Sequence, residues 1–218
     1  MEKVFVIGAG GHAKVVIDAI EKAKLFEIPF LVDDDASLKG KNIFGYPVLG
    51  NRTDLAALAK EIPGHGCFVA IGNNLVRIRL EHWLKTRGFR PVTAIHPSAQ
   101  IARGVRIGIN TVIMAGAVIN SDATVGTSVI VNTAAGVDHD CLIGDGTHIA
   151  PGCSLCGSVT VGPRTLIGAG TTVVHGVTIG SDVIVGAGSV VVENIPPNVI
   201  AMGNPARAVR DNRPESQP

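Results

Sequence analysis

Aromatic residues are scarce and unevenly placed in this chain of 218 residues. Six phenylalanines, one tyrosine and one tryptophan are the full set, and none follows Phe89. A conventional packed core obtains much of its bulk from aromatic side chains, so the chain beyond residue 89 must fill its interior in another way. The change in composition near residue 90 therefore predicts a domain boundary.

Strong net charge and long apolar runs are also absent. The 19 lysines and arginines nearly balance the 18 aspartates and glutamates, which gives no electrostatic reason to expect nucleic acid or an anionic membrane as a partner. No run approaches the ~20 apolar residues of a transmembrane helix, and the short apolar run near Met1 does not make a signal peptide. The four cysteines form no dense framework, which indicates a reducing compartment. We expect a soluble, cytoplasmic protein.

What the second half does contain is a period of six. Every sixth residue from Ile101 to Val191 is aliphatic, and every one except Leu155 is β-branched. The next residue is often glycine, and the residue four places on is small. This period fits neither a helix nor a flat amphipathic strand, but it fits a coil of short parallel strands whose β-branched side chains stack inward. Each repeat needs its neighbours to bury its aliphatic face, so the array is predicted to be a solenoid.

The hexapeptide pattern resembles the hexapeptide-repeat acyltransferases. That resemblance implies a left-handed parallel β-helix, although parallel crossovers are otherwise almost always right-handed. It also implies triangular coils of about eighteen residues, so that residues 101–190 would form about five coils stacked ~4.8 Å apart.

The first half alternates apolar strands with helical patterns. Residues 4–7 precede a glycine turn and residues 13–24 have helical apolar spacing, while further apolar runs end at Asp33 and at Gly72. Alternating β and α elements predict a parallel sheet with its ligand crevice at the carboxyl ends of the strands. We expect a Rossmann-like α/β domain over residues 1–93, a left-handed parallel β-helix of hexapeptide repeats over 94–198 and a C-terminal tail over 199–218.

A glycine-rich motif lies at that crevice. Gly8, Gly10 and Ala13 match G-x-G-x-x-A, and the start of the following helix offers backbone amides to a phosphate. A carboxylate among residues 33–35 could hold a ribose hydroxyl, although a solvated turn is the structural alternative. An NAD-dependent dehydrogenase is one interpretation. The first half, however, has room for only half of a dinucleotide fold, so a mononucleotide or nucleotide sugar fits better.

His139 interrupts the bland array between Asp138 and Asp140. It takes the third position of its hexapeptide and not an inward position. A hydrogen-bonded carboxylate would fix the tautomer of this imidazole and raise its basicity, as a general base requires. A surface turn is the structural alternative. His175 has the same repeat position two coils later without carboxylate neighbours, and it is expected to be a surface turn residue.

The repeat spacing makes a statement about geometry. Gly157 follows His139 by one coil and should stack beside it, where its N–H could face an acyl carbonyl. His148 is only half a coil away, so the two histidines should point apart. They can serve one site only if the β-helices of two chains pack side by side. This motivates the hypothesis of an active site between the subunits of a cyclic trimer.

Two cysteines in a Cys-x-x-Cys pattern, Cys153 and Cys156, raise a redox or zinc alternative. A redox motif of this type needs a helix N-terminus, and zinc needs two further ligands, neither of which is evident. Cys141 and Cys153 occupy the small inward position of the repeat. We expect them to be small core residues, and we expect no metal.

Six segments together resemble one bacterial family: GAGGHAKVV, DDD, AIGNN, IHPSA, VNTAAGVDHDCLIGDGTHIAPG and GNPAR. This family comprises the nucleotide-amino-sugar N-acetyltransferases of the sialic acid O-acetyltransferase-like group, and the resemblance covers essentially the whole chain. It implies transfer of an acetyl group from acetyl-CoA to the 4-amino group of a UDP- or GDP-linked 4-amino-4,6-dideoxy sugar, in surface-glycan or glycoprotein sugar biosynthesis. It also implies a homotrimer.

The resemblance assigns roles by position. His139 matches the general base, and Asp140 matches an acidic neighbour that is commonly glutamate in the family. Because aspartate is shorter by one methylene, the choice between Asp138 and Asp140 as partner of the imidazole stays open. The positions that match acetyl-CoA contacts are His148, Gly157 and Ala169. The positions that match nucleotide-sugar contacts are Gly10, Gly11, His12, Asp33, Asp34 and Gly72.

Other functions remain as alternatives. The main one is a sugar O-acetyltransferase acting on sialic acid or a related hydroxyl acceptor, which would not need a nucleotide pocket. A non-catalytic scaffold trimer and the dehydrogenase are the others. The choice between UDP and GDP, the stereochemistry of the sugar and the pathway are open.

Overall fold

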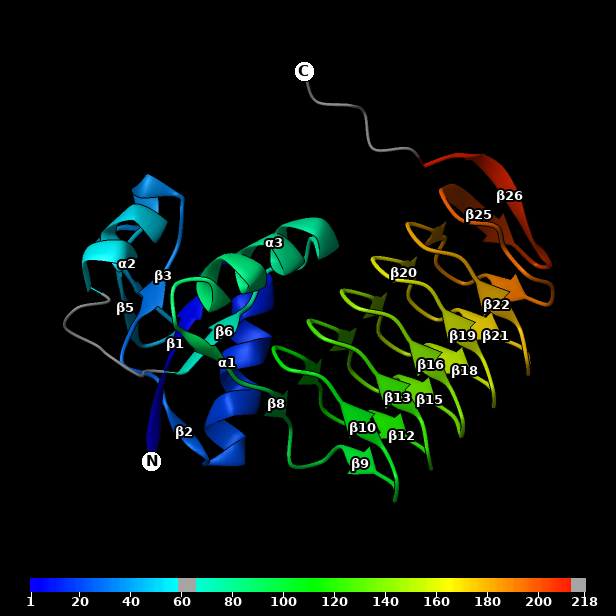
Figure 1. Ribbon diagram of the computed structural model, residues 1–218, viewed down its shortest axis with the longest axis horizontal. Coiled ribbons are helices and arrows are strands. Elements are labelled where there is room, and N and C mark those ends of the chain that lie inside the picture. Colours follow the sequence, from blue (N-terminus) through cyan, green and yellow to red (C-terminus); the bar gives the residue numbers. More distant parts are fainter. Residues whose placement is uncertain (59–65, 213–218) are drawn as a thin grey trace. The chain divides into compact units, whose positions relative to one another are not determined.

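The computed structural model describes residues 1–58 and 66–212, and it divides into two compact units, Met1–Pro97 and Ser98–Pro218 (Figure 1). The first unit contains α/β elements, and the second consists of short stacked strands. The predicted fold class, a Rossmann-like α/β unit followed by a left-handed parallel β-helix, is confirmed.

The first unit is built on a mostly parallel sheet with the order β4-β5-β3-β1-β6-β7. Its strands are β1 (Glu2–Ile7), β2 (Phe26–Glu27), β3 (Leu31–Val32), β4 (Asn42–Ile43), β5 (Tyr46–Gly50), β6 (Gly66–Val69) and β7 (Arg90–Pro91), and the next strand along the chain, β8 (Ala94–Ile95), is not part of this sheet. The helices are α1 (Gly11–Ala23), η1 (Ala36–Leu38), α2 (Arg52–Leu58) and α3 (Asn74–Lys85). The chain order reverses between β1 and β6, so the crevice of such a sheet is expected where these two strands end.

The aromatic residues form the centre of this unit. The ring of Phe5 stacks on Phe30 with centroids 5.5 Å apart and meets Phe89 edge-on at 5.2 Å. Phe5, Leu55, Leu84 and other apolar side chains join in one buried cluster under α2 and α3. The small domain therefore obtains its bulk from rings, as aromatic-rich cores do.

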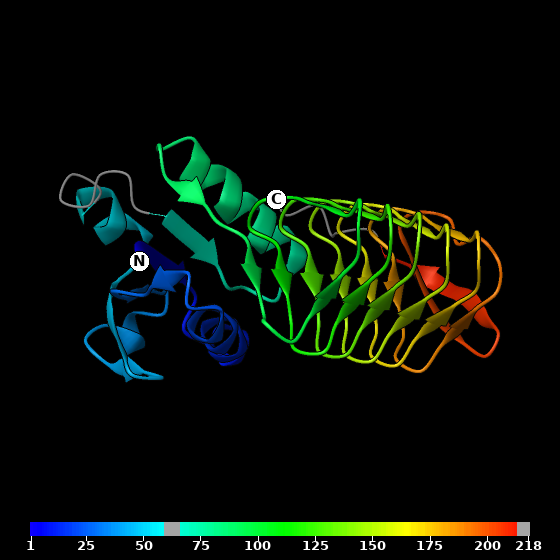
Figure 2. The ribbon, with the colours of Figure 1, turned by 90° about the horizontal axis from the view of Figure 1, so that it is seen from below.

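The second unit is a parallel β-helix with three faces (Figure 2). The β9 face contains β9 (Gln100–Ile101), β12 (Val118–Ile119), β15 (Gly136–Val137), β18 (Ser154–Leu155), β21 (Thr172–Val173) and β24 (Val190–Val191). The β10 face contains β10 (Arg106–Ile107), β13 (Thr124–Val125), β16 (Leu142–Ile143), β19 (Thr160–Val161) and β22 (Thr178–Ile179). The β11 face contains β11 (Val112–Ile113), β14 (Ile130–Val131), β17 (His148–Ile149), β20 (Leu166–Ile167), β23 (Ile184–Val185), β25 (Val199–Gly203) and β26 (Ala206–Asp211).

From β9 to β24, paired strands lie one coil, 18 positions, apart, as Ile119 and Val137 do, and Asn120 contacts Asp138 at the same spacing. The sixth-residue aliphatic positions from Ile113 to Val191 are buried and form one continuous core. The small inward positions tie consecutive coils together, since Thr165 Oγ1 donates to Gly180 O at 2.7 Å and Cys153 Sγ to Gly168 O at 3.1 Å. Stacked β-branched residues and small donors thus replace aromatic bulk.

The array continues further than the sequence pattern indicates. Residues 199–218 are predicted to be a tail, but β25 adds in parallel to β23 and β26 folds back along it through a turn at residues 204–205. Ile200 and Ala201 are buried there and cover the last coil. The rest of that segment, beyond residue 212, lies outside the described residues. Among the described helices, none is long and apolar enough to cross a membrane.

The tight stacking of coils gives a test of the fold. A Cβ at Gly144 would lie 2.6 Å from Pro163 N of the next coil, whereas a Cβ at Gly136 would meet nothing nearer than 3.9 Å. We expect Gly144→Ala to lower the free energy of unfolding by about 1–3 kcal/mol or more, since overpacked backbone must shift. Gly136→Ala, the matched control, should unfold like the wild type in urea. Equal midpoints for the two variants would contradict this packing.

Candidate active site

His139 lies on the edge of the β-helix between the β9 face and the β10 face. It occupies the turn between β15 and β16, and the residues that stack on it along this edge are Gly157 and His175. The side chain of His139 is 52% exposed, so a substrate can reach it.

The imidazole of His139 is oriented by Asp140. Asp140 Oδ2 lies 2.8 Å from His139 Nδ1, which makes Nδ1 the protonated nitrogen and leaves the lone pair on Nε2. The pKa of His139 is raised, first by this hydrogen bond and then by the charges of Asp138 and Asp140. A more basic imidazole with a fixed tautomer is what general-base chemistry requires.

Asp138 has a different task. Its Oδ1 accepts from the backbone N of His139 at 2.8 Å and from Asn120 Nδ2 at 2.7 Å. The hydrogen bonds from Asn120 and the His139 amide hold the pKa of this carboxyl below its usual value. The choice left open by the sequence is therefore resolved: Asp140 contacts the ring, and Asp138 anchors the turn.

Gly157 lies directly against the imidazole. A Cβ on Gly157 would lie 2.5 Å from both Cε1 and Nε2 of His139, so only glycine leaves the ring in place. The Gly157 amide donates no hydrogen bond to another residue in the described part of the chain. This N–H is thus available beside Nε2, in the region where an oxyanion would need a donor.

His175 is a neighbour that the sequence assigns only to a surface turn. Its ring centroid lies 6.4 Å from that of His139, and the charge of His175 also contributes to the lowered pKa of Asp138. The signal was available in the repeat: His139 and His175 share one edge, and the residue between them on that edge is glycine.

His148 and Ala169 lie elsewhere on the coil. His148 is on β17 of the β11 face, where its Nε2 is 3.0 Å from Asn132 Nδ2, and Ala169 is in the turn between β20 and β21. Within one chain, the structure does not bring either residue to His139. Their assigned contacts with acetyl-CoA stay predictions.

Cys141 and Cys153 are core residues, as the repeat predicts. Cys141 and Cys153 are buried and donate to carbonyls of the next coil, and all four cysteines are free. Burial raises the pKa of the Cys141 and Cys153 thiols, which makes them poor nucleophiles. Within residues 1–58 and 66–212, no group of three or more His, Cys, Asp and Glu side chains is arranged to hold a metal.

The glycine-rich turn of the first unit presents open backbone. Gly8 has φ +109° and a Cβ there would lie 2.7 Å from Ala70 O, whereas Cβ atoms at Gly10 and Gly11 would meet nothing within 4 Å. The side chain of His12 in the first turn of α1 is half-buried; burial, followed by the charge of Arg77, lowers its pKa to about 4. His12 is therefore uncharged at neutral pH.

The two predicted ribose ligands have protein partners. Asp33 Oδ2 accepts from Ala9 N at 2.7 Å and Oδ1 from Asp35 N at 2.9 Å, so Asp33 ties the turn after β3 to the turn after β1. Asp34 Oδ2 lies 2.7 Å from Arg52 Nε. The contact of these carboxylates with a ribose stays a prediction.

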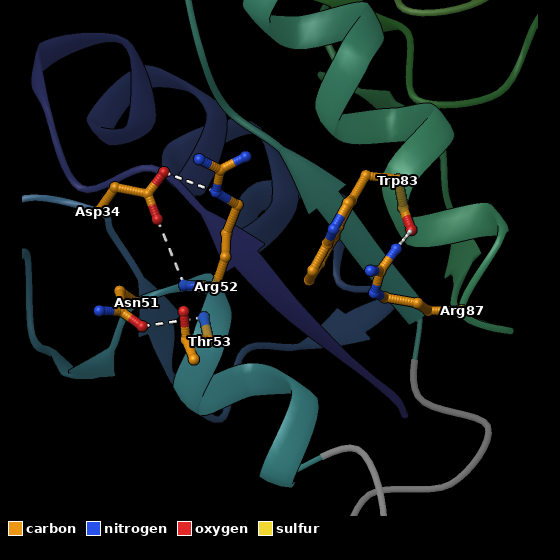
Figure 3. Close-up of a pocket in the computed structure, with 6 residues that line it drawn as sticks. All are labelled: Asp34, Asn51, Arg52, Thr53, Trp83 and Arg87. Atoms are coloured by element: carbon orange, nitrogen blue, oxygen red, sulfur yellow. Dashed lines mark hydrogen bonds and ion pairs between the residues drawn. The ribbon is translucent and has the colours of Figure 1, made fainter.

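A pocket of about 530 Å³ opens beside Asp34 (Figure 3). On one side Asp34 and Asn51 hold the start of α2, since Asn51 Oδ1 accepts from Thr53 N at 2.9 Å. On the other side the guanidinium of Arg87 lies 4.1 Å over the ring of Trp83. Sequence reasoning missed this pocket because its walls come from separate helices with no shared motif.

Comparison with known proteins decides the family. Residues 3–84 match the PglD N-terminal domain, and residues 140–175 and 158–192 match the bacterial transferase hexapeptide of six repeats. A histidine-to-asparagine variant of perosamine N-acetyltransferase from Caulobacter crescentus, in complex with CoA and GDP-perosamine, is 42% identical. The match covers 97% of this chain and 98% of that one with a TM-score of 0.92.

The chain belongs to the nucleotide-amino-sugar N-acetyltransferases.

Two further relatives agree. The acetyltransferase domain of PglB from Neisseria gonorrhoeae FA1090, in complex with acetyl coenzyme A, is 38% identical over 95% of this chain and 99% of that one, with a TM-score of 0.87. UDP-N-acetylbacillosamine N-acetyltransferase of Bacillus subtilis strain 168 is 37% identical over 117 residues; this match spans about half of each protein, 53% of this chain and 52% of the relative. The predicted class, an acetyl-CoA-dependent sugar N-acetyltransferase, is confirmed.

The two aspartates beside His139 should differ in their effect on the pH profile. Neutral imidazole is the active form of a base, so the rate should rise with pH through the raised pKa of His139. Asp140→Asn removes the main cause of the raised pKa of His139. We expect the ascending limb of kcat/KM to move to lower pH and kcat to fall about 10-fold to 100-fold.

Asp138→Asn is the matched control, because its isosteric amide keeps an oxygen for Asn120 and the His139 amide. The ascending limb should move less than in Asp140→Asn. A larger shift in Asp138→Asn would show that Asp140 is not the partner that sets the basicity of His139.

Proposed function

We propose that the protein transfers the acetyl group of acetyl-CoA to the 4-amino group of a nucleotide-linked 4-amino-4,6-dideoxy sugar, in the cytoplasm and in the service of surface-glycan or glycoprotein sugar synthesis. The observation that carries this proposal is the 2.8 Å contact between Asp140 and His139 beside the glycine at residue 157. The Caulobacter relative with CoA and GDP-perosamine supports the substrate class and makes a GDP-linked sugar the first to test.

The chemistry is a direct acyl transfer. The amine of the sugar attacks the thioester carbonyl, so that an N–C bond forms and the C–S bond breaks. His139 Nε2 takes the proton of the attacking amine and can return it to the departing thiolate of CoA. In this proposal the Gly157 amide donates to the oxyanion that develops on the carbonyl.

The test is release of the CoA thiol from acetyl-CoA with a panel of GDP- and UDP-linked 4-amino-4,6-dideoxy sugars and free sialic acid. We expect turnover with one nucleotide amino sugar and a fall of about 100-fold to 10,000-fold in His139→Ala, the range that a general base contributes. His82→Ala, which changes an exposed histidine on α3, is the control and should keep full activity.

Two outcomes would contradict the proposal. Turnover with sialic acid alone would make the protein a sugar O-acetyltransferase. Undiminished turnover in His139→Ala would show that His139 is not the general base.

We further propose that the working form is a homotrimer with active sites between subunits. His139 lies in the turn between β15 and β16 and His148 lies on the β11 face, half a coil further on, so in this proposal acetyl-CoA contacts both by lying between two chains. Sedimentation combined with activity measurement over a dilution series should show activity falling with the trimer fraction. A fully active monomer would contradict this assembly.

A further inference from the structure

Arg77 is a buried arginine in the first turn of α3. Its exposed fraction is 1%, which is rare for a guanidinium because a desolvated charge is stable only with polar contacts. Burial lowers its pKa to about 9, so it remains charged at neutral pH. The helix that carries Arg77 begins at the carboxyl end of β6, beside β1 in the sheet.

The side chain of Arg77 gathers the loop that precedes its own helix. Nη1 donates to the carbonyls of Ile71 at 2.9 Å and Gly72 at 3.0 Å, and Nη2 donates to Asn74 Oδ1 at 2.8 Å. Asn73 completes the loop by capping α3, since its Oδ1 accepts from Val76 N at 3.0 Å. Two consecutive peptide carbonyls therefore point inward to one guanidinium.

The planarity of the peptide bond then fixes the amides. In a trans peptide the C=O and N–H point in opposite directions, so the N–H groups of Gly72 and Asn73 must point away from Arg77. Among the described residues, neither amide donates to a protein acceptor. Gly72 is exposed and a Cβ there would meet nothing within 4 Å, so a ligand has room to approach.

The position of these amides agrees with a nucleotide crevice. β1 and β6 are adjacent and in register, with Ile7 opposite Val69, so the turns that follow them lie at the same edge of the sheet. The charge of Arg77 helps to lower the pKa of His12, which lies in the first turn of α1. The open glycines of the first turn and the amides of the second thus surround one place.

We propose that Arg77 is a positioning residue for substrate binding, which fixes the Gly72 and Asn73 amides so that they donate to the diphosphate oxygens of the nucleotide sugar. The inference rests on the proposed function for the identity of the ligand. The buried positive charge of Arg77 favours an anion at those amides. A purely structural arginine would change stability without a selective effect on one substrate.

The test compares Arg77→Met, which keeps the volume and removes the donors, with Arg77→Lys, which keeps the charge. Without Arg77 the Gly72 and Asn73 amides would no longer be fixed for hydrogen bonds to the charged diphosphate. We therefore expect Arg77→Met to raise KM for the nucleotide sugar about 10-fold to 100-fold. KM for acetyl-CoA and kcat should stay within about twofold. Arg77→Lys should fall between Arg77→Met and the wild type. Arg79→Met, the same change at an exposed site on α3, is the control.

A second variant keeps the inference testable if Arg77→Met does not fold. Gly72→Ala has room for its methyl group in the free protein, yet that group covers the approach to the amides. It should also raise KM for the nucleotide sugar selectively. A folded Arg77→Met with unchanged KM, or an unchanged KM in Gly72→Ala, would overturn the inference.

Direct binding separates this inference from the proposed function. Calorimetry with GDP, UDP and the corresponding nucleosides should show weaker diphosphate binding in Arg77→Met and no change for the nucleosides. If no nucleotide amino sugar is turned over, the proposed function fails, and the diphosphate titration alone decides the role of Arg77. An equal loss for nucleosides would place the amides at the base and contradict the diphosphate assignment.

Discussion

The register of the β-helix is the constraint on which the rest of the structure depends. Each coil returns to the same edge after 18 residues, as the Asn120–Asp138 contact shows. Side chains that share an edge therefore form a fixed column, while those half a coil apart never meet in one chain. Inward positions need only be aliphatic or small, so chemistry is confined to the edges and outer faces.

The edge that carries His139 shows what this confinement permits. An exposed imidazole would ordinarily be mobile, but Asp140 holds its ring, Asp138 holds its backbone, and Gly157 leaves space for it on the next coil. In the first unit the fixing group is buried and the groups that it fixes are backbone. There a buried guanidinium, Arg77, directs backbone groups outward. Both units thus place polar groups at the surface by fixing them from a rigid framework.

Sequence predicted the features that follow from periodicity and missed those that depend on rotamers or distant packing. The inward residues from Ile113 to Val191 and the stacking of Gly157 on His139 follow from counting. The choice between Asp138 and Asp140 does not, because both flank the histidine and only side-chain geometry separates them. Nothing in the sequence distinguishes Arg77 from an ordinary helical residue, because its role depends on contacts with the preceding loop. β25 was missed because it lies beyond the last regular repeat.

The proposal that the active site is shared between two subunits is tested most directly by subunit mixing. His139→Ala and His148→Ala trimers should each be nearly inactive at low acetyl-CoA. Co-refolding them in equal amounts should restore up to about a quarter of wild-type activity, because random cyclic assembly pairs an intact His139 with a neighbour's intact His148 at that frequency. A mixture that stays as inactive as its parents would contradict the shared site.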